Sequence, residues 1–165
     1  MKKKICILLF LITLLLLGCE NMKNTPTSKV ESFFSKYQRL DSDVLNDLDL
    51  VIEKDNTMNE KQKQEYKTLM EKQYQNLSYK INKEEINNNT ATVDTEIEVL
   101  DYESVMYKLN SNDKEEEYID NKIKYLKDVT SKTKQKITFH LHKKDGIWII
   151  DDLSDIDIQK IHGFY

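Results

Sequence analysis

Residues 137–153 read ITFHLHKKDGIWIIDDL, and they carry the clearest structural signal in the chain. Apolar and polar residues alternate up to Leu141, which is the two-residue period of a strand that buries one face. Asp145-Gly146 favours a tight turn, and residues 147–153 supply the returning strand. This stretch therefore predicts an antiparallel hairpin with Trp148 on its inner face.

A second alternating pattern lies farther upstream. Residues 77–81 and 91–99 place apolar side chains at every second position. Asn87-Asn88-Asn89 lies between them, and asparagine tolerates the left-handed backbone that a hairpin turn needs. The two hairpins together predict a curved, mostly antiparallel sheet.

Three helical segments precede these strands. Thr25-Pro26 offers an N-cap followed by proline at the first helical position, and Ser28-x-x-Glu31 forms an overlapping capping box. Apolar residues recur at helical spacing after this start and again over residues 44–52. Thr57-x-x-Glu60 is another capping box, which opens a third helix reaching Tyr74.

The rest of the chain predicts shorter helices. Residues 103–129 have apolar residues at helical spacing, and this pattern is strongest from Tyr118 onward. Residues 108–116 are so highly charged that their sequence fits either a loop or a frayed helix. Ser154 can cap a short helix over residues 155–161. Gly163 stands where the C-terminal cap of that helix would be.

The order of these elements resembles the nuclear transport factor 2-like cone fold, and in particular small bacterial lipoproteins of unknown function that use it. The resemblance covers residues 26–165 and is most specific at Thr25-Pro26, with the helix that follows, and at KKDGIW, residues 143–148. It implies a single α+β domain over residues 26–165, with three N-terminal helices packed on the concave face of the sheet. A cystatin-like helix-on-sheet arrangement is the near alternative, because its helix-first order looks similar.

The N-terminus has the layout of a secretory signal peptide. Three lysines precede an apolar run from Ile5 to Leu17, and Gly18 and Cys19 follow. Leu16-Leu17-Gly18-Cys19 resembles the lipobox of bacterial lipoproteins, in which the cysteine is diacylated and becomes the mature N-terminus. We therefore expect residues 1–18 to be a signal peptide, Cys19 to be the lipid attachment site and residues 19–25 to be a tether.

Two other interpretations of this segment fit less well. A retained transmembrane helix needs about 20 apolar residues, and this run is shorter and has no positive cluster after it. Cleavage at an ordinary signal site leaves the Gly18-Cys19 pair without a role. The lysine-, asparagine- and isoleucine-rich composition is typical of a low-GC Gram-positive bacterium, which would place the protein on the outer face of its cytoplasmic membrane.

Charge and cysteine content exclude several classes of function for the mature protein. Removal of residues 1–18 takes away three lysines, so the 25 basic residues become 22 against 29 acidic ones, a formal charge of −7. This balance argues against nucleic acid as a partner and against a polybasic membrane patch. Cys6 lies in the signal and Cys19 carries the lipid, so no cysteine remains for a disulfide, a thiolate nucleophile or a zinc site.

Two sets of polar residues are candidate sites of chemistry. His140 and His142 share one face of a strand and could bind a metal ion with a third ligand among Glu96, Glu98, Asp151 and Asp152. Their alternation with Phe139 and Leu141 instead favours two solvated histidines, so we expect no metal. The acids near strand ends are Asp94, Asp101, Asp151 and Asp152, with His162 after the last helix.

No spacing singles out an acid–base pair among those residues, so we expect a binding or accessory module of the cell envelope that is not an enzyme and needs no cofactor. The alternatives are a small hydrolase or isomerase with a buried acid in a cone pocket, and a purely structural interaction domain. The candidate pocket-lining residues are aromatic and lie on predicted inner faces: Tyr37, Tyr66, Tyr79, Phe139 and Trp148. They suit a small apolar or amphipathic ligand, although the same side chains could simply fill the core.

Overall fold

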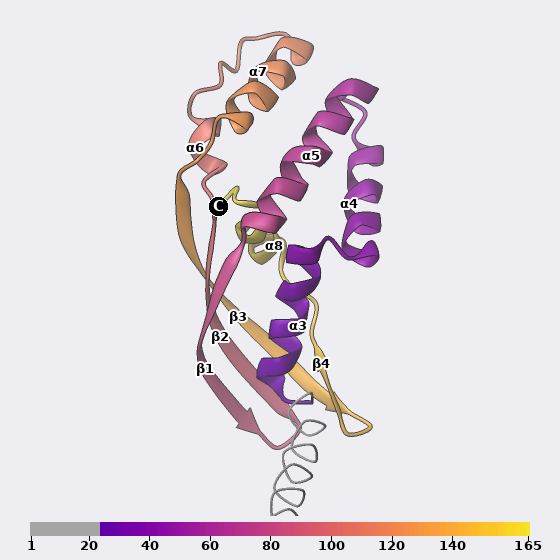
Figure 1. Cartoon of the computed structure of the whole chain (residues 1–165), viewed down its shortest axis with the longest axis vertical. Helices are drawn as coiled ribbons and strands as arrows, with labels where there is room; N and C mark the ends of the chain where they lie inside the picture. Colours follow the sequence, from indigo (N-terminus) through magenta and orange to yellow (C-terminus); the bar gives the residue numbers. More distant parts are fainter. Residues whose placement is uncertain (1–23) are drawn as a thin grey trace, which may run out of the picture.

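The computed structural model describes residues 24–165 (Figure 1). The predicted signal peptide, Cys19 and the tether up to residue 23 lie outside the described residues. The elements are α3 Pro26–Arg39, α4 Ser42–Lys54, α5 Glu60–Asn76, β1 Ser78–Asn87, β2 Thr90–Leu100, α6 Glu103–Met106, α7 Glu115–Lys127, β3 Lys132–Lys144, β4 Ile147–Ile150 and α8 Asp155–His162.

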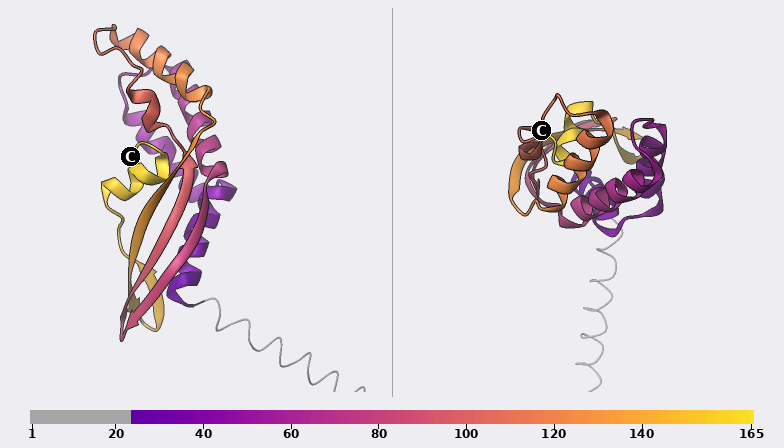
Figure 2. Two further views of the ribbon diagram at one scale, coloured as in Figure 1. Left: turned by 90° about the vertical axis from the view of Figure 1, so that its left-hand side faces the viewer. Right: turned by 90° about the horizontal axis from the view of Figure 1, so that it is seen from above.

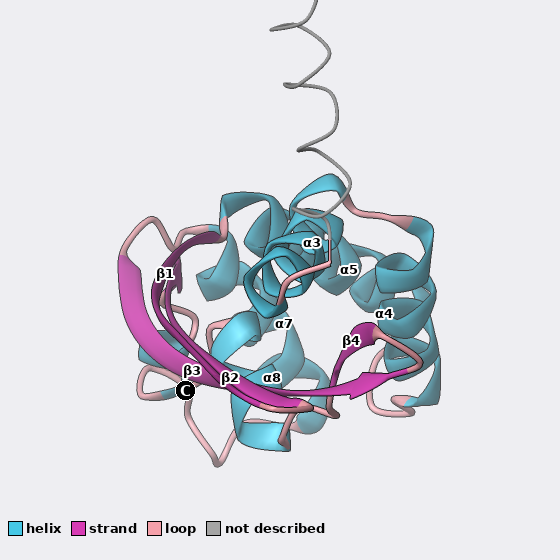
Figure 3. Cartoon of the chain, turned by 90° about the horizontal axis from the view of Figure 1, so that it is seen from below, coloured by secondary structure: helices cyan, strands magenta, loops and turns pink. Residues whose placement is uncertain are grey.

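The four strands form one open antiparallel sheet in the order β1-β2-β3-β4. β2 and β3 pair from Thr90 opposite His142 to Leu100 opposite Lys132, so they form one long ribbon. The sheet curves around one side of α3, as the view from below shows (Figure 3). The fold class is α+β with an antiparallel sheet, as the sequence predicts.

Both predicted hairpins are confirmed. Asn88 (φ 55°) turns the first, and Asp145 (φ 50°) and Gly146 (φ 80°) turn the second with two left-handed residues. Strand β4 ends at Ile150, three residues before the predicted end at Leu153. The Asp151 N–H still donates to the His140 carbonyl at 2.9 Å, and the chain then leaves the sheet to reach the N-cap of α8 at Ser154.

The inner face of the second hairpin follows the predicted register. Phe139 and Leu141 are 0% and 1% exposed, and Trp148 is 5% exposed. His140 and His142, which alternate with them, are exposed on the outer face. Since a slip by one residue would exchange these faces, the buried tryptophan fixes the register of this hairpin.

The N-terminal helices form two layers, where the sequence predicted three helices on the sheet. Helix α3 packs against β1, β2 and β4, and α5 packs against β2. Helix α4 packs mainly against α5 and forms an outer layer. Its buried residues Val44, Leu48 and Ile52 make a single narrow stripe, which is enough to cover one neighbour only.

Two predicted capping boxes are wrong by a few residues. Helix α3 is capped by Thr25 with Ser28 as its partner, so Ser28 lies inside the helix and does not begin a box with Glu31. Helix α5 is capped by Asn59, whose carboxamide oxygen accepts from the backbone N–H of Gln62 at 3.0 Å. The hydroxyl of Thr57, the predicted cap, is instead bonded to Asp55 at 2.5 Å.

The helical segment after β2 breaks where its composition becomes charged. Helix α6 has only four residues, and α7 begins at Glu115, so residues 107–114 form the loop that the sequence left open. Helices α6 and α7 lie beyond one end of the sheet, and both hairpin turns lie at the opposite end (Figure 2). The described domain is therefore long, with a helical end and a hairpin end.

Candidate functional site

Most of the predicted pocket aromatics are core residues. The ring of Tyr37 lies 5.0 Å from Phe33 and 4.9 Å from Tyr74, measured between centroids. Tyr79 stacks on Phe34 at 4.7 Å. Phe139 lies 5.4 Å from both Phe33 and Phe34. These rings pack against one another between α3 and the sheet, in edge-to-face and stacked contacts that stabilise a core.

The other two predicted aromatics lie apart from that cluster. Trp148 is buried at the hairpin end, where the ammonium of Lys143 lies 5.4 Å from its ring centroid. Tyr66, on α5, faces α7 at the helical end, and it is the one predicted residue that lines the cavity described next. The structure therefore joins Tyr37, Tyr79 and Phe139 in one cluster and separates Tyr66 and Trp148 from it.

A cavity of about 310 Å³ lies at the helical end of the domain. It is formed by the end of α4, the loop before α5, the middle of α5 and the first half of α7. This volume is at the small end of the usual range for ligand pockets. The lining residues are Val51, Ile52, Asp55, Thr57, Met58, Tyr66, Glu115, Tyr118, Ile119, Lys122 and Ile123.

The cavity combines apolar walls with one inward cation. Ile52, Ile119 and Ile123 are buried and form most of the apolar wall. The ammonium of Lys122 lies 5.4 Å from the ring centroids of both Tyr66 and Phe164. These are cation–π distances, and each ring face offers the charge a weak partner.

Burial determines the protonation behaviour of the two polar groups in the wall. It lowers the pKa of the Lys122 ammonium, and the nearby negative charge of Asp55 opposes this shift only in part. Burial also raises the pKa of the Tyr66 phenol to about 12, with a smaller contribution from Asp55. At neutral pH the Tyr66 hydroxyl therefore stays protonated and can donate a hydrogen bond.

The acidic residues of the cavity lie at its rim. The Asp55 carboxylate accepts from the backbone N–H of Thr57 at 2.8 Å and from its hydroxyl at 2.5 Å. These two bonds hold the pKa of Asp55 below its usual value. Glu115 is exposed. Both negative charges are therefore solvated or already bonded, whereas Lys122 lies inside.

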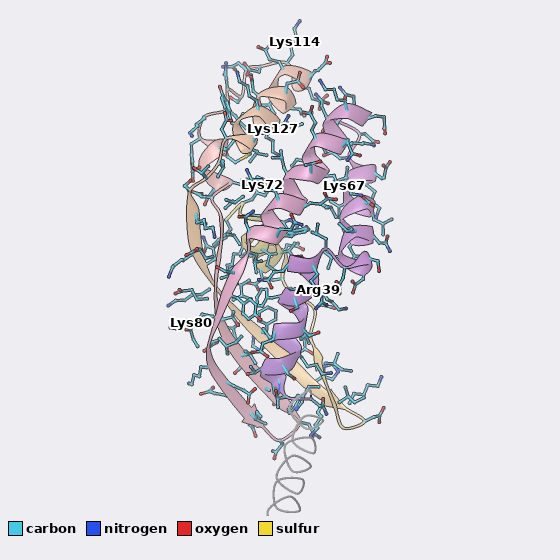
Figure 4. The ribbon with its side chains drawn as sticks, viewed as in Figure 1. Arg39, Lys67, Lys72, Lys80, Lys114 and Lys127 are labelled. Carbon is cyan, nitrogen blue, oxygen red and sulfur yellow. The ribbon has the colours of Figure 1, made fainter. Side chains whose placement is uncertain are left out.

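Side-chain bonds fix the spacing of the helices around the cavity. Gln62 donates to Asp120 at 2.8 Å, and Lys127 pairs with Glu65 at 2.9 Å, so α5 and α7 are joined at two levels. Figure 4 shows Lys72 and Lys127 between these helices, and the Lys72 ammonium reaches the Lys127 carbonyl at 3.4 Å. On the other side, Lys67 pairs with Asp49 of α4 at 2.5 Å.

The histidines weighed as metal ligands lie on the outer face of the sheet. His142 Nδ1 is 2.5 Å from Asp151 Oδ1, and His140 is exposed. Within residues 24–165, no group of three or more His, Cys, Asp or Glu side chains is arranged to hold a metal ion.

The residues weighed as acid and base are not brought together. Asp94 accepts from the Thr138 hydroxyl at 2.7 Å, and Asp101 accepts from the backbone of Ser104 at 3.2 Å. His162 lies elsewhere, with its Nε2 atom 3.0 Å from the Tyr74 hydroxyl. Burial lowers the pKa of His162 to about 4, so it is neutral and forms a structural pair with Tyr74.

The key residue of the cavity, Lys122, was not among the predicted site residues. Its only signal in the sequence is that a lysine occupies an inward position in the apolar stripe of the α7 segment. A lysine at such a position can also extend its head to solvent, so the position alone does not indicate a site. The packing of α7 on α5 places the ammonium against Tyr66.

Comparisons with models of protein families, with curated proteins and with solved structures found no match to this chain. None of the helices between residues 24 and 165 has both the length and the apolar character that crossing a membrane requires.

Proposed function

We propose that this protein is a lipid-anchored binding module on the outer face of the cytoplasmic membrane, attached through Cys19. Its helical-end cavity would take up a small ligand without transforming it. The lipobox-like Leu16–Cys19 segment supports the anchor. The cavity supports a binding role, because most of its wall is apolar and its buried polar groups, Lys122 and Tyr66, are hydrogen-bond donors.

The observation that carries this proposal is the position of Asn24 relative to the cavity. Its side chain donates to the Gly146 carbonyl at 2.9 Å and accepts from the Trp148 N–H at 3.2 Å, which fastens the start of the domain to the second hairpin. The cavity lies at the other end, beyond the sheet (Figure 1). The thirteen residues of β3 alone span about 40 Å of this separation.

The tether then determines how the domain would stand on the membrane. Five residue steps separate Cys19 from Asn24, which is at most about 18 Å of extended chain. A lipid on Cys19 would hold the hairpin end near the bilayer and direct the cavity away from it. This arrangement suits a module that meets its ligand outside the membrane.

We further propose that the domain belongs to the cone-shaped, nuclear transport factor 2-like folds. The order of three helices, a hairpin, a helical insertion and a second hairpin supports this assignment. The curvature of the sheet around α3 supports it as well. The cystatin-like alternative shares the helix-on-sheet packing, but it does not account for the α6–α7 insertion.

The anchor is tested by labelling growing cells with an alkyne analogue of palmitate. We expect the wild-type chain to incorporate the label and to pellet with membranes. The Cys19→Ala chain should lose the label and either remain an uncleaved precursor or leave the membrane. Label that persists in the Cys19→Ala chain would contradict the proposed attachment site.

A further inference from the structure

The cavity contains a cation that forms no direct ion pair within residues 24–165, although the charge of Asp55 in the same wall acts on it from a greater distance. Among residues 24–165, no carboxylate oxygen lies within 4.0 Å of the Lys122 ammonium. Its neighbours are the ring faces of Tyr66 and Phe164. Removing an ammonium from water is costly, and two cation–π contacts offset this cost only in part.

A hydrogen-bond donor belongs to the wall of the same cavity. Tyr66 lines the same cavity, and its hydroxyl has no hydrogen-bond partner within the described part of the chain. The ammonium and the phenol are both donors in the wall of one cavity, and the complementary group is an anion that can accept from them. Charge-assisted hydrogen bonds of this kind are about twice as strong as bonds between neutral groups.

The acids of the rim do not contact the ammonium directly, and the charge of Asp55 offsets the effect of burial only in part. Asp55 is bonded to Thr57, and Glu115 extends into solvent. Most of the remaining wall is apolar, and it includes Ile52, Ile119 and Met58. The complementary ligand therefore has an anionic head and a short hydrocarbon body.

We propose that the cavity binds a small amphipathic carboxylate, with its head on Lys122 and Tyr66 and its chain between α4 and α7. This inference rests on the binding half of the proposed function and is independent of lipid attachment. Lys122 acts as the specificity-determining residue, because the apolar walls accept any chain of suitable size and only the ammonium distinguishes a charged head from a neutral one.

The test uses the mature, lipid-anchored protein in nanodiscs, labelled with ¹³C in the methionine methyl groups. Met58 lines the cavity and reports on binding, and Met106 on α6 serves as an internal reference. The probes are hexanoate and hexan-1-ol, which have the same chain length but different heads. Empty nanodiscs give the background from partition into lipid.

We expect hexanoate to shift the Met58 resonance and to saturate at a concentration about tenfold or more below that of hexan-1-ol. Lys122→Gln should bring hexanoate close to the affinity of the alcohol, whereas Lys122→Arg should retain much of the preference for hexanoate. Lys124→Gln is the matched control, since Lys124 is exposed on the same helix.

Each other outcome overturns a definite part of this scheme. The assigned ligand class would be wrong if the wild type bound the two probes with equal affinity. It would also be wrong if the preference for hexanoate survived Lys122→Gln. In both cases the cavity would still be a binding site. A Met58 resonance that neither probe shifts would overturn binding at this cavity altogether. Lipidation is measured separately at Cys19, so its failure is distinguishable from both.

Discussion

At the scale of single residues, the two most informative side chains are polar groups inside the domain. His162 is held neutral against Tyr74, and Lys122 is held against two aromatic rings. Burial lowers the pKa of both. Their surroundings differ. His162 is enclosed between α5 and α8, whereas Lys122 lines a cavity. The first therefore affects stability, and the second can affect binding.

His162 should make the domain less stable in mild acid. The unfolded chain binds a proton on this histidine below pH about 6.5, whereas the folded chain binds it only near pH 4. The unfolded state therefore gains protons first as the pH falls. We expect the free energy of unfolding to drop by about 2 kcal/mol from pH 7.5 to pH 5, measured by urea denaturation.

The control for this effect is His140, which is exposed on the outer face of the sheet. His162→Gln should remove most of the pH dependence in this window, since glutamine does not titrate. His140→Gln should leave it unchanged. A His162→Gln domain with the wild-type pH profile would assign the effect to another group.

At the scale of elements, a buried glutamine of α5 joins that helix to the end of β2, and the end of α8 packs against this contact. The amide of Gln73 donates to the Leu100 carbonyl at 2.9 Å and accepts from its N–H at 2.8 Å. Gly163 ends α8 with φ of 77° and lies directly over this contact. A Cβ atom on Gly163 would lie 2.1 Å from the Gln73 Nε2 atom and 2.2 Å from the Leu100 oxygen.

Gly146 and Gly163 have nearly equal φ angles, but we expect their substitution by alanine to lower the free energy of unfolding by different amounts. Gly146→Ala adds a side chain in open space at φ of 80°, so it should lower the free energy of unfolding by about 1–2 kcal/mol through backbone strain. Gly163→Ala adds the same strain and a clash with a backbone carbonyl, so it should cost at least about 3 kcal/mol. Urea denaturation of both variants checks the difference, and equal costs would mean that α8 moves away from Leu100 freely.

At the scale of the whole molecule, the two ends of the domain differ in structure. The hairpin end binds Asn24, the first described residue, and the helical end carries the cavity. The long β2–β3 ribbon and the helices α3 and α5 form the body between them (Figure 2). The proposed anchor would therefore leave the cavity facing outward.

This orientation predicts the distances of two surface positions from the membrane. Once Cys19 is acylated, an introduced cysteine is the only free thiol of the mature chain, so it can carry a dye. Lys144→Cys lies beside the second hairpin turn and Lys114→Cys at the helical end (Figure 4). We expect strong energy transfer to acceptor-labelled lipids from position 144 and weak transfer from position 114, since a strand of about 40 Å separates the two ends. Similar transfer from both positions would mean that the domain lies flat.

The alternating strands, the two turns and the first helix could be predicted from sequence because their signals are local. A two-residue period, an Asp-Gly pair and a Thr-Pro start each depend on backbone and side-chain geometry within a few residues. The exact helix caps were harder to predict, since Thr57 and Asn59 are both good caps. The choice depended on which side chain was already bonded to Asp55.

Tertiary packing decided which inward residues line a cavity and which fill the core. Tyr37, Tyr66 and Tyr79 look alike in sequence, because each occupies the apolar stripe of its element. The crossing of α4, α5 and α7 leaves the cavity beside Tyr66, whereas Tyr37 packs on Phe33 and Tyr74 and Tyr79 stacks on Phe34. The sequence by itself determined the helices and strands and the expected anchor at Cys19, since the signals for both lie in residues that are adjacent in the chain. The candidate site depends on contacts between segments far apart in the chain, and only the folded structure brings Lys122, Tyr66 and Phe164 together.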